Sequence, residues 1–255
     1  MRAALLLIGL VLAPAPARAD GLLLTLSTPK VVIASNFQGG EVTLFGAAVD
    51  ASGAVQSVED YDLVVTTRGP AETLTVREKS RSHGLWLNRS GREFREVPYF
   101  LNVLSSRPLD EITDFQRRRE GGLGLDAVAA GGLSNALTPL KGDDAKFSAA
   151  LRRLQERRLL WREDASGVEV IGSSLFKGAI TLPPNVPFGD FSIEARLMRA
   201  GVTVATGATT FRVAKDGFEA RVAGLAETNR AAYGAATVAL ALLFGWLASV
   251  MFRRD

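Results

Sequence analysis

The sequence has no cysteine and a single histidine, and these two shortages exclude several kinds of chemistry. Without cysteine the chain has no disulfides, no thiolate metal sites and no thiol catalysis. A serine–histidine–aspartate triad would have to use His83, and there is no second histidine to complete a metal pair. Because His83 lies in a stretch typical of a turn between strands, we interpret it as a surface residue.

The chain also has little net charge once its two ends are set aside. The formal charge is +3, but residues 1–19 and 253–255 contain four arginines and one acid between them. Residues 20–252 carry equal numbers of acidic and basic side chains. This balance gives no reason to expect nucleic-acid binding. Phosphate-binding loops, nucleophile elbows and EF-hand spacings do not occur either. We therefore predict no cofactor, no metal and no enzymatic activity.

Two pairs of carboxylates are the remaining candidates for acid–base or calcium chemistry. Asp60 and Asp62 flank Tyr61, and Asp143 and Asp144 are adjacent. We interpret the first pair as part of a strand edge. The second pair precedes a helical pattern, so we interpret Asp143 or Asp144 as a helix cap.

The N-terminal residues have the features of a secretory signal peptide. Arg2 precedes an apolar run, prolines follow it, and Ala17 and Ala19 form a small-residue cleavage signature. The apolar run, residues 3–13, is too short to cross a bilayer core of about 30 Å. We therefore expect residues 1–19 to be removed on export.

An uncharged stretch at the other end, residues 231–252, predicts one transmembrane helix. At 1.5 Å per residue it would reach about 33 Å, enough to cross the bilayer core. Arg253 and Arg254 follow it, and the positive-inside rule places them in the cytoplasm. With the signal peptide, this predicts a single-pass protein of the bacterial inner membrane, with a periplasmic N-terminal body and a cytoplasmic tail of residues 253–255.

Small residues recur every four positions along this predicted span. They are Thr237, Ala241, Gly245 and Ser249. Such a seam lets a second helix approach closely, either from a partner or from another copy of the chain. The alternative is a simple anchor, in which the seam only reflects how common Ala and Gly are in this chain.

Residues 20–106 have the two-residue period of β-strands, interrupted by turns rich in Gly, Pro, Asn and Asp. The pattern predicts a mainly β fold with an immunoglobulin-like β-sandwich in this region. We expect a bulge at Gly46 and a turn at RSGRE, residues 89–93.

A helical segment is expected over residues 107–165. Its first helix begins near Pro108 and ends at the glycines 121 and 122, with acids in the first turn and arginines in the last. The glycine-rich stretch 123–142 predicts a loop. A second helix follows from residue 143, and its apolar stripe is Phe147, Leu151, Leu154 and Trp161.

The second predicted helix, over residues 145–162, also has a basic face. The face consists of Arg152, Arg153, Arg157 and Arg158. We interpret it as a solvated face, and the alternatives are contact with an anionic membrane surface or with an acidic partner.

Strand patterns return after residue 166. Arg199, Ala200 and Gly201 predict a hairpin turn between two of these strands. We expect residues 166–214 to form a second, smaller β domain, although they could instead complete the first sheet. Residues 215–230 are polar and would form a juxtamembrane stalk.

Five ordered stretches resemble a family of uncharacterised alphaproteobacterial transmembrane proteins with a signal peptide and one C-terminal span. The stretches are VVIASNFQGGEVTLFG (31–46), GLWLN (84–88), VPYFLNVLSSRPL (97–109), LPPNVPFGDFSIEARL (182–197) and the C-terminal residues 233–255. The resemblance brings no established activity. It implies a partner in the membrane, a permease of the sulfite-exporter type.

Two functional hypotheses follow. In the first, the protein is a non-enzymatic accessory or assembly factor for an inner-membrane protein such as a transporter. In the second, it is a ligand-binding module of the envelope whose anchor is dispensable.

Overall fold

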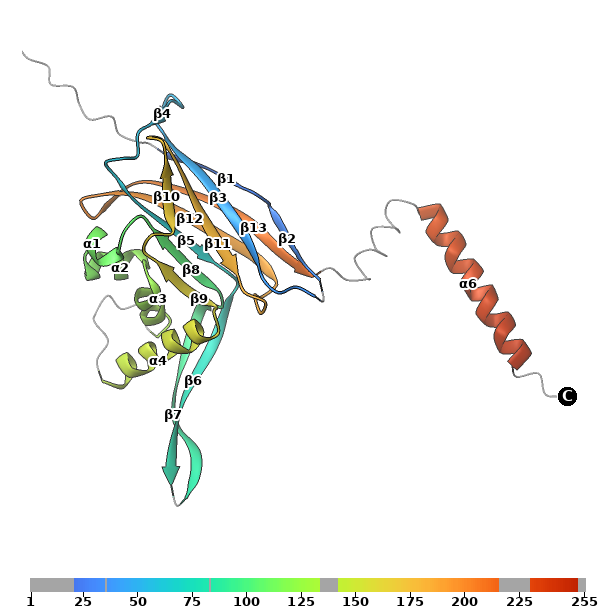
Figure 1. The fold of residues 1–255 in the computed structure, drawn as a ribbon. Helices are drawn as coiled ribbons and strands as arrows, with labels where there is room; N and C mark the ends of the chain where they lie inside the picture. Colours follow the sequence, from blue (N-terminus) through green and yellow to red (C-terminus); the bar gives the residue numbers. More distant parts are fainter. Residues whose placement is uncertain (1–20, 35, 83, 134–141, 216–229, 252–255) are drawn as a thin grey trace, which may run out of the picture. The chain divides into compact units, whose positions relative to one another are not determined.

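The computed structural model in Figure 1 describes residues 21–34, 36–82, 84–133, 142–215 and 230–251. The chain divides into two compact units. One unit contains residues up to Val31 together with Gln38–Val213, and it is a mainly β body. The other contains Val32–Phe37 and the residues from Ala214 onward, including helix α6 (Arg230–Met251).

Two β-sheets and a separate hairpin form the body. The order of the first sheet is β1-β3-β11-β10, with β4 beside β3, and that of the second is β2-β13-β12-β5-β8-β9. The strands of the first sheet are β1 (Gly21–Leu26), β3 (Gly40–Val49), β4 (Val55–Gln56), β10 (Val168–Ile171) and β11 (Leu175–Leu182). Those of the second are β2 (Lys30–Ile33), β5 (Asp62–Arg68), β8 (Leu101–Ser105), β9 (Trp161–Asp164), β12 (Gly189–Arg199) and β13 (Val202–Lys215). The hairpin consists of β6 (Ala71–Ser82) and β7 (Leu85–Pro98).

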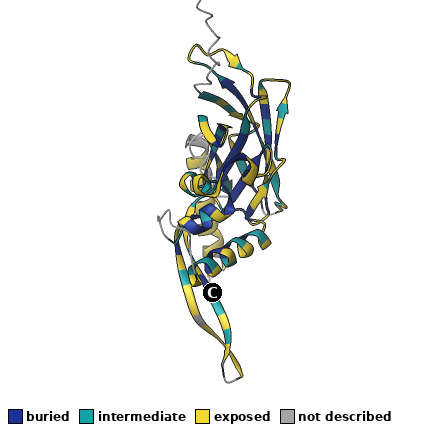
Figure 2. Cartoon of the chain, turned by 90° about the vertical axis from the view of Figure 1, so that its left-hand side faces the viewer, coloured by how far each residue is buried: buried dark blue, intermediate teal, exposed yellow. Residues whose placement is uncertain are grey.

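The two sheets face each other, and the core lies between them (Figure 2). A Cβ on Gly207 of β13 would overlap Leu22 of β1, and one on Gly178 of β11 would touch Leu104 of β8. Buried residues alternate along β11 and β12, as expected for strands that cover a core on one face. Strand β8 is buried along its whole length, because the first sheet covers one face and helices cover the other.

Among the described residues between β8 and β9, four helices are present, and they pack beside the second sheet (Figure 1). They are α1 (Leu109–Ile112), α2 (Phe115–Gly121), α3 (Leu125–Gly131) and α4 (Asp143–Arg157). Each except α2 buries apolar side chains.

The predicted division into two β domains is wrong. Strand β11 pairs with β3, and β12 pairs with β5, so the strands of residues 166–214 complete both sheets of the first block. The alternation along each strand indicated a buried face, but it carries no information about which strand lies beside it. The predicted hairpin turn is confirmed at Ala200 and Gly201, which both have positive φ.

Several helix boundaries also differ from the prediction. The first helix is broken, because Thr113 is extended and Asp114 starts α2 by accepting a hydrogen bond from the Arg117 backbone N–H at 2.9 Å. The predicted loop contains α3, whose glycines lie at its start and end. The cap expected at Asp143 or Asp144 is wrong, since Gly142 is the N-cap and both aspartates lie in the first turn of α4.

Trp161 is not part of the α4 stripe. It begins strand β9, which runs parallel to β8, and its side chain is fully buried. Phe147 and Leu151 are buried as predicted, whereas Leu154 is 45% exposed. The turn predicted at residues 89–93 is wrong as well, because β7 continues through it and pairs there with β6.

Gly46 is not a bulge, because β3 keeps regular pairing with β1 and β11 at this position. A Cβ on Gly46 would overlap the ring of Phe176, its partner on β11. The ring is fully buried, so the absence of a side chain at Gly46 provides the space for it.

We predict that Gly46→Val lowers the free energy of unfolding by about 1–3 kcal/mol, the usual cost of overpacking a core. Urea unfolding followed by circular dichroism measures the effect. Gly131→Ala is the control, because no atom lies within 4 Å of its added Cβ. Equal stability of the Gly46→Val protein and the wild type would contradict the conclusion that Gly46 provides the space for the Phe176 ring.

A half-buried charge cluster joins the second sheet to α2. Glu194 accepts a hydrogen bond from Arg196 Nε at 2.8 Å and pairs with Arg68 Nη1 at 3.5 Å. Arg68 Nη2 donates to the Gly122 carbonyl at the end of α2, at 2.9 Å. The hydrogen bond from Arg196, followed by the charges of both arginines, lowers the pKa of Glu194 below its ordinary value of 4.5.

A lowered pKa means that the folded state favours the ionised carboxylate, so Glu194 contributes stability above its ordinary pKa and loses it as the pH falls. We predict that Glu194→Gln is less stable than the wild type near neutral pH. The difference should shrink as the pH falls from about 5 toward 3. Urea midpoints across this range measure it, with the exposed Glu59→Gln as control. A difference that stays constant would refute the role of the cluster.

Candidate functional site

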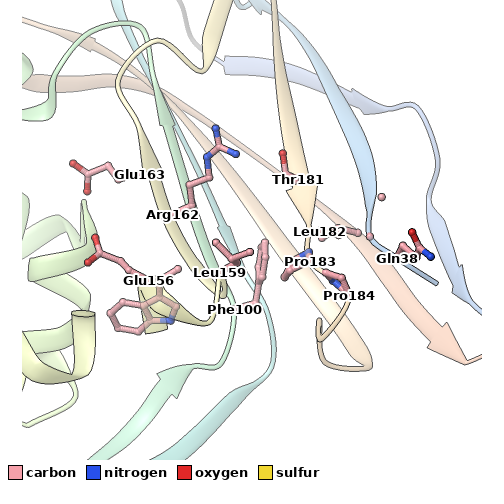
Figure 3. A pocket seen from close by; sticks show the side chains of 13 residues that line it. Gln38, Phe100, Glu156, Leu159, Arg162, Glu163, Thr181, Leu182, Pro183 and Pro184 are labelled. Atoms are coloured by element: carbon pink, nitrogen blue, oxygen red, sulfur yellow. The ribbon is translucent and has the colours of Figure 1, made fainter. Parts of the chain in front are cut away.

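The clearest candidate site is a cavity of about 510 Å³ in the body. It lies where the start of β3, the end of β11 and strand β9 come together beside the C-terminal end of α4 (Figure 3). Its volume is within the range of sites for small ligands or single peptide segments. We call it the groove, and its lining residues are Gln38, Gly39, Gly40, Phe100, Glu156, Leu159, Trp161, Arg162, Glu163, Thr181, Leu182, Pro183 and Pro184.

The base of the groove is rigid and apolar. Phe100, Trp161 and Leu182 line it, and all three are nearly fully buried. The indole Nε1 of Trp161 donates to the Pro98 carbonyl at 3.0 Å, which fixes the ring and satisfies its polar atom. Pro183 restricts the backbone at the end of β11. An apolar group entering the groove would therefore meet a preformed surface.

Leu159 lies at the rim of the groove in an unusual backbone conformation. After α4, the Leu159 N–H donates to the Glu156 carbonyl, and the Leu160 N–H donates to the Gln155 carbonyl. This pair of bonds is a Schellman motif, in which glycine usually occupies the left-handed position. Here Leu159 occupies it at φ 59°, with its side chain 68% exposed. The chain thus carries a strained, exposed leucine at the opening of a cavity.

The charged side chains at the groove already have partners within the body. Glu163 Oε2 accepts from the Leu125 backbone N–H at 3.1 Å, at the start of α3. Glu156 pairs with Arg152 at 3.1 Å, and Arg162 pairs with Asp164 at 3.1 Å. A hydrogen bond from the Ser166 backbone N–H is the main cause that lowers the pKa of Asp164, and Arg162 adds to it. These pairings favour an uncharged, apolar occupant over a small ion.

The sequence predictions did not include the groove. Its residues come from four separate stretches, 38–40, 100, 156–163 and 181–184, and no motif joins them. Two local signals were present: the Leu159–Leu160 pair between arginines, and the prolines after β11. Neither signal shows that the two stretches meet.

Three of the four carboxylates in these pairs form ion pairs with arginines. Asp62 accepts from Arg107 Nε at 2.5 Å and Nη2 at 2.8 Å, while Asp60 lies 3.7 Å from Arg199. Asp144 accepts from Arg92 Nε at 2.7 Å, which joins α4 to β7. Across the residues that the structure describes, no three His, Cys, Asp or Glu side chains gather as a metal site.

The basic face of α4 is partly used within the body. Arg152 pairs with Asp126 at 2.7 Å as well as with Glu156. Arg158 donates to the Tyr99 hydroxyl at 2.7 Å and lies over its ring. These contacts attach α4 to α3 and to the base of the hairpin, so two of the four arginines have a structural role.

The remaining sequence predictions concern the two ends of the chain. His83, Ala17, Ala19, Arg253 and Arg254 lie outside the described residues, as do the signal peptide, the cytoplasmic tail and most of the stalk.

The predicted helix near the C-terminus is confirmed as α6, and the packing role of its small-residue seam stays a prediction. The seam residues Thr237, Ala241, Gly245 and Ser249 are exposed, and the Thr237 hydroxyl donates to the Tyr233 carbonyl at 2.9 Å. Among the helices that the structure describes, none is both long and apolar enough for a membrane crossing.

A comparison with known protein families shows to which family the chain belongs. The family described as "Putative transmembrane protein (Alph_Pro_TM)" matches residues 21–254. The chain belongs to this family. The resemblance noted in the sequence is therefore confirmed over the body and α6 together. Membership identifies the protein as one of a membrane family and assigns no activity to it.

Other comparisons add little. No curated protein matches the chain. Among solved structures, the crystal structure of Spo0M, a sporulation control protein from Bacillus subtilis, is similar over 82% of this chain and 55% of that chain, so this protein spans about half of its length. The two are 10% identical with a TM-score of 0.26. A likeness at this level supports no argument about fold or function.

We predict that Leu159→Gly raises the free energy of unfolding by about 1 kcal/mol, because it removes the cost of the left-handed conformation. Thermal unfolding measures the change. Ala200→Gly is the matched control, since Ala200 also has positive φ but lies in the β12–β13 turn, away from the groove. If Leu159→Gly lowers the free energy of unfolding and Ala200→Gly does not, the leucine is retained for packing within the body.

Proposed function

We propose that this protein is a non-enzymatic accessory or assembly factor for an inner-membrane protein, anchored by its C-terminal apolar segment. The signal peptide exports a body with an immunoglobulin-type sandwich to the periplasm, and the C-terminus stays in the cytoplasm. The observation that carries the proposal is the exposed apolar surface of α6 over residues 240–247.

The exposed apolar residues of α6 are distributed around the whole helix. Successive residues are rotated by about 100°, so the run from 240 to 247 covers all directions. Its exposed large side chains are Leu240, Leu242, Leu243, Phe244, Trp246 and Leu247, each at least 48% exposed. A helix that is apolar all round belongs either in a protein core or in a bilayer. Membership of a transmembrane family favours the bilayer.

Two surfaces support a partner in the membrane. The seam at Thr237, Ala241, Gly245 and Ser249 would allow close packing against a helix of the partner, because small side chains let the backbones approach. The groove, with Leu159 at its rim, would bind an apolar segment of the same partner on the periplasmic side. A transporter is the proposed partner, and the family resemblance suggests a permease of the sulfite-exporter type.

The second candidate function is a ligand-binding module with a dispensable anchor. The groove favours it, because its volume and apolar base also suit a small uncharged ligand. In this case the seam would have no role, and the whole function would lie in the body.

Photocrosslinking in native membranes tests the proposal. We predict that a photoreactive residue at Gly245 forms a crosslink to one membrane protein, identified by mass spectrometry. The same residue at Leu243 is the control, because two positions along a helix place it on nearly the opposite side. Flotation of membranes in the same preparation reports whether the full chain is anchored.

Each outcome separates the hypotheses. A crosslink to one transporter from Gly245, weaker from Leu243 and reduced by Leu159→Gly, supports the accessory factor. A crosslink of the chain to itself, or to lipid alone from both positions, contradicts a partner at the seam. Full chain that does not float with membranes contradicts the anchor.

A further inference from the structure

The β6–β7 hairpin extends from the body and presents a hydrophobic tip (Figures 1 and 2). Beyond Val76 and Phe94, which are buried at its base, the described residues of the two strands are largely exposed on both faces. At the tip, Leu85, Trp86 and Leu87 follow one another and are 66%, 68% and 48% exposed. A hairpin that is solvated on both faces gains nothing for its own folding from these three side chains.

Cations lie directly behind the apolar tip. In the register of the hairpin, Arg81 is opposite Trp86, and Lys79 is opposite Asn88. At about 3.3 Å per residue, Lys79 is therefore about 7 Å farther from the tip than Arg81. The end of the hairpin, from Lys79 to its partner Asn88, contains two cations, Lys79 and Arg81, and no acid. The end of the hairpin is thus both apolar and positively charged.

The basic surface continues toward α4. A cavity of about 510 Å³ lies between β6 and α4, with an apolar wall that includes the half-exposed Leu154. Its cations are Arg77, Lys79, Lys146 and Arg153, and its one acid, Glu78, is paired with Lys146 at 2.6 Å. The excess of positive charge on this side selects a negatively charged partner surface.

We propose that the tip of the β6–β7 hairpin inserts into the interface of an anionic lipid bilayer. Tryptophan is favoured at the boundary between headgroups and acyl chains, where its ring is buried and its N–H stays hydrated. Leu85 and Leu87 bury apolar surface beside it. Lys79 and Arg81 lie at headgroup level, where they attract the phosphates of anionic lipids. This is a second membrane contact, made by the body and distinct from the anchor.

The absence of native cysteine makes a direct test simple. Full-length Leu85→Cys protein, labelled with a nitroxide, is reconstituted into vesicles of phosphatidylethanolamine and phosphatidylglycerol. Electron paramagnetic resonance then compares the collision of the label with oxygen, which enters the bilayer, and with a water-soluble nickel chelate. Ala51→Cys is the control, because residue 51 lies in the exposed turn that leads into β4, and β4 lies at the other end of the body from the hairpin tip (Figure 1).

We expect the label at position 85 to favour oxygen and the label at position 51 to favour the chelate. The double variant Lys79→Ser, Arg81→Ser should lower the ratio of embedded to aqueous label about 30-fold. This follows because each basic residue near an anionic surface contributes about 1 kcal/mol to binding. Vesicles of phosphatidylcholine alone should lower it similarly. Trp86→Ser should lower it in both kinds of vesicle, because it removes apolar surface.

Other results overturn the proposal. If the chain floats with the vesicles but the label at position 85 stays aqueous, the anchor stands and the hairpin contact fails. Insertion that is equal in neutral and anionic vesicles refutes the role of Lys79 and Arg81. A label that is aqueous in vesicles but immobilised in native membranes means that the tip binds a protein.

Discussion

The pairing of late strands with early ones is the interaction that organises the body. Strand β11 lies against β3, and β12 lies against β5, so each sheet is made from both ends of the sequence. The core lies between the two sheets, so it forms only when these pairs are in place. The helices between β8 and β9 then have a fixed surface to cover.

The groove is a consequence of this arrangement. Strand β9 adds to the edge of the second sheet in parallel with β8, while β11 ends in two prolines on the first sheet. The chain must turn sharply from α4 into β9, and it does so with Leu159 in a left-handed conformation. A glycine there would satisfy the turn without strain. The leucine instead places an apolar side chain at the opening, which is reasonable if an occupant buries it.

In the part of the chain that the structure describes, three apolar surfaces are open: the groove, the hairpin tip and residues 240–247 of α6. They differ in their electrostatics. The charges of the groove are paired internally, those behind the hairpin tip are largely of one sign, and the described part of α6 has a single charged residue, at its start. The proposals for the three surfaces follow these differences: an uncharged segment for the groove, an anionic interface for the tip and the interior of a bilayer for α6.

Local chemistry in the sequence was enough to predict much of the secondary structure. The two-residue alternation located most strands, Ala200 and Gly201 indicated a hairpin, and the uncharged run near the C-terminus indicated α6. The sequence could not show that Trp161 belongs to a strand, because its spacing from Leu154 fits a helix and the end of α4 is set by the Schellman turn. Only the tertiary structure decided which strands pair. Alternation shows which face of a strand is buried, but it does not show which strand lies beside it. The tertiary structure alone brought Phe100, Leu159 and Pro183 together, because these residues are distant in the chain and share only their packing.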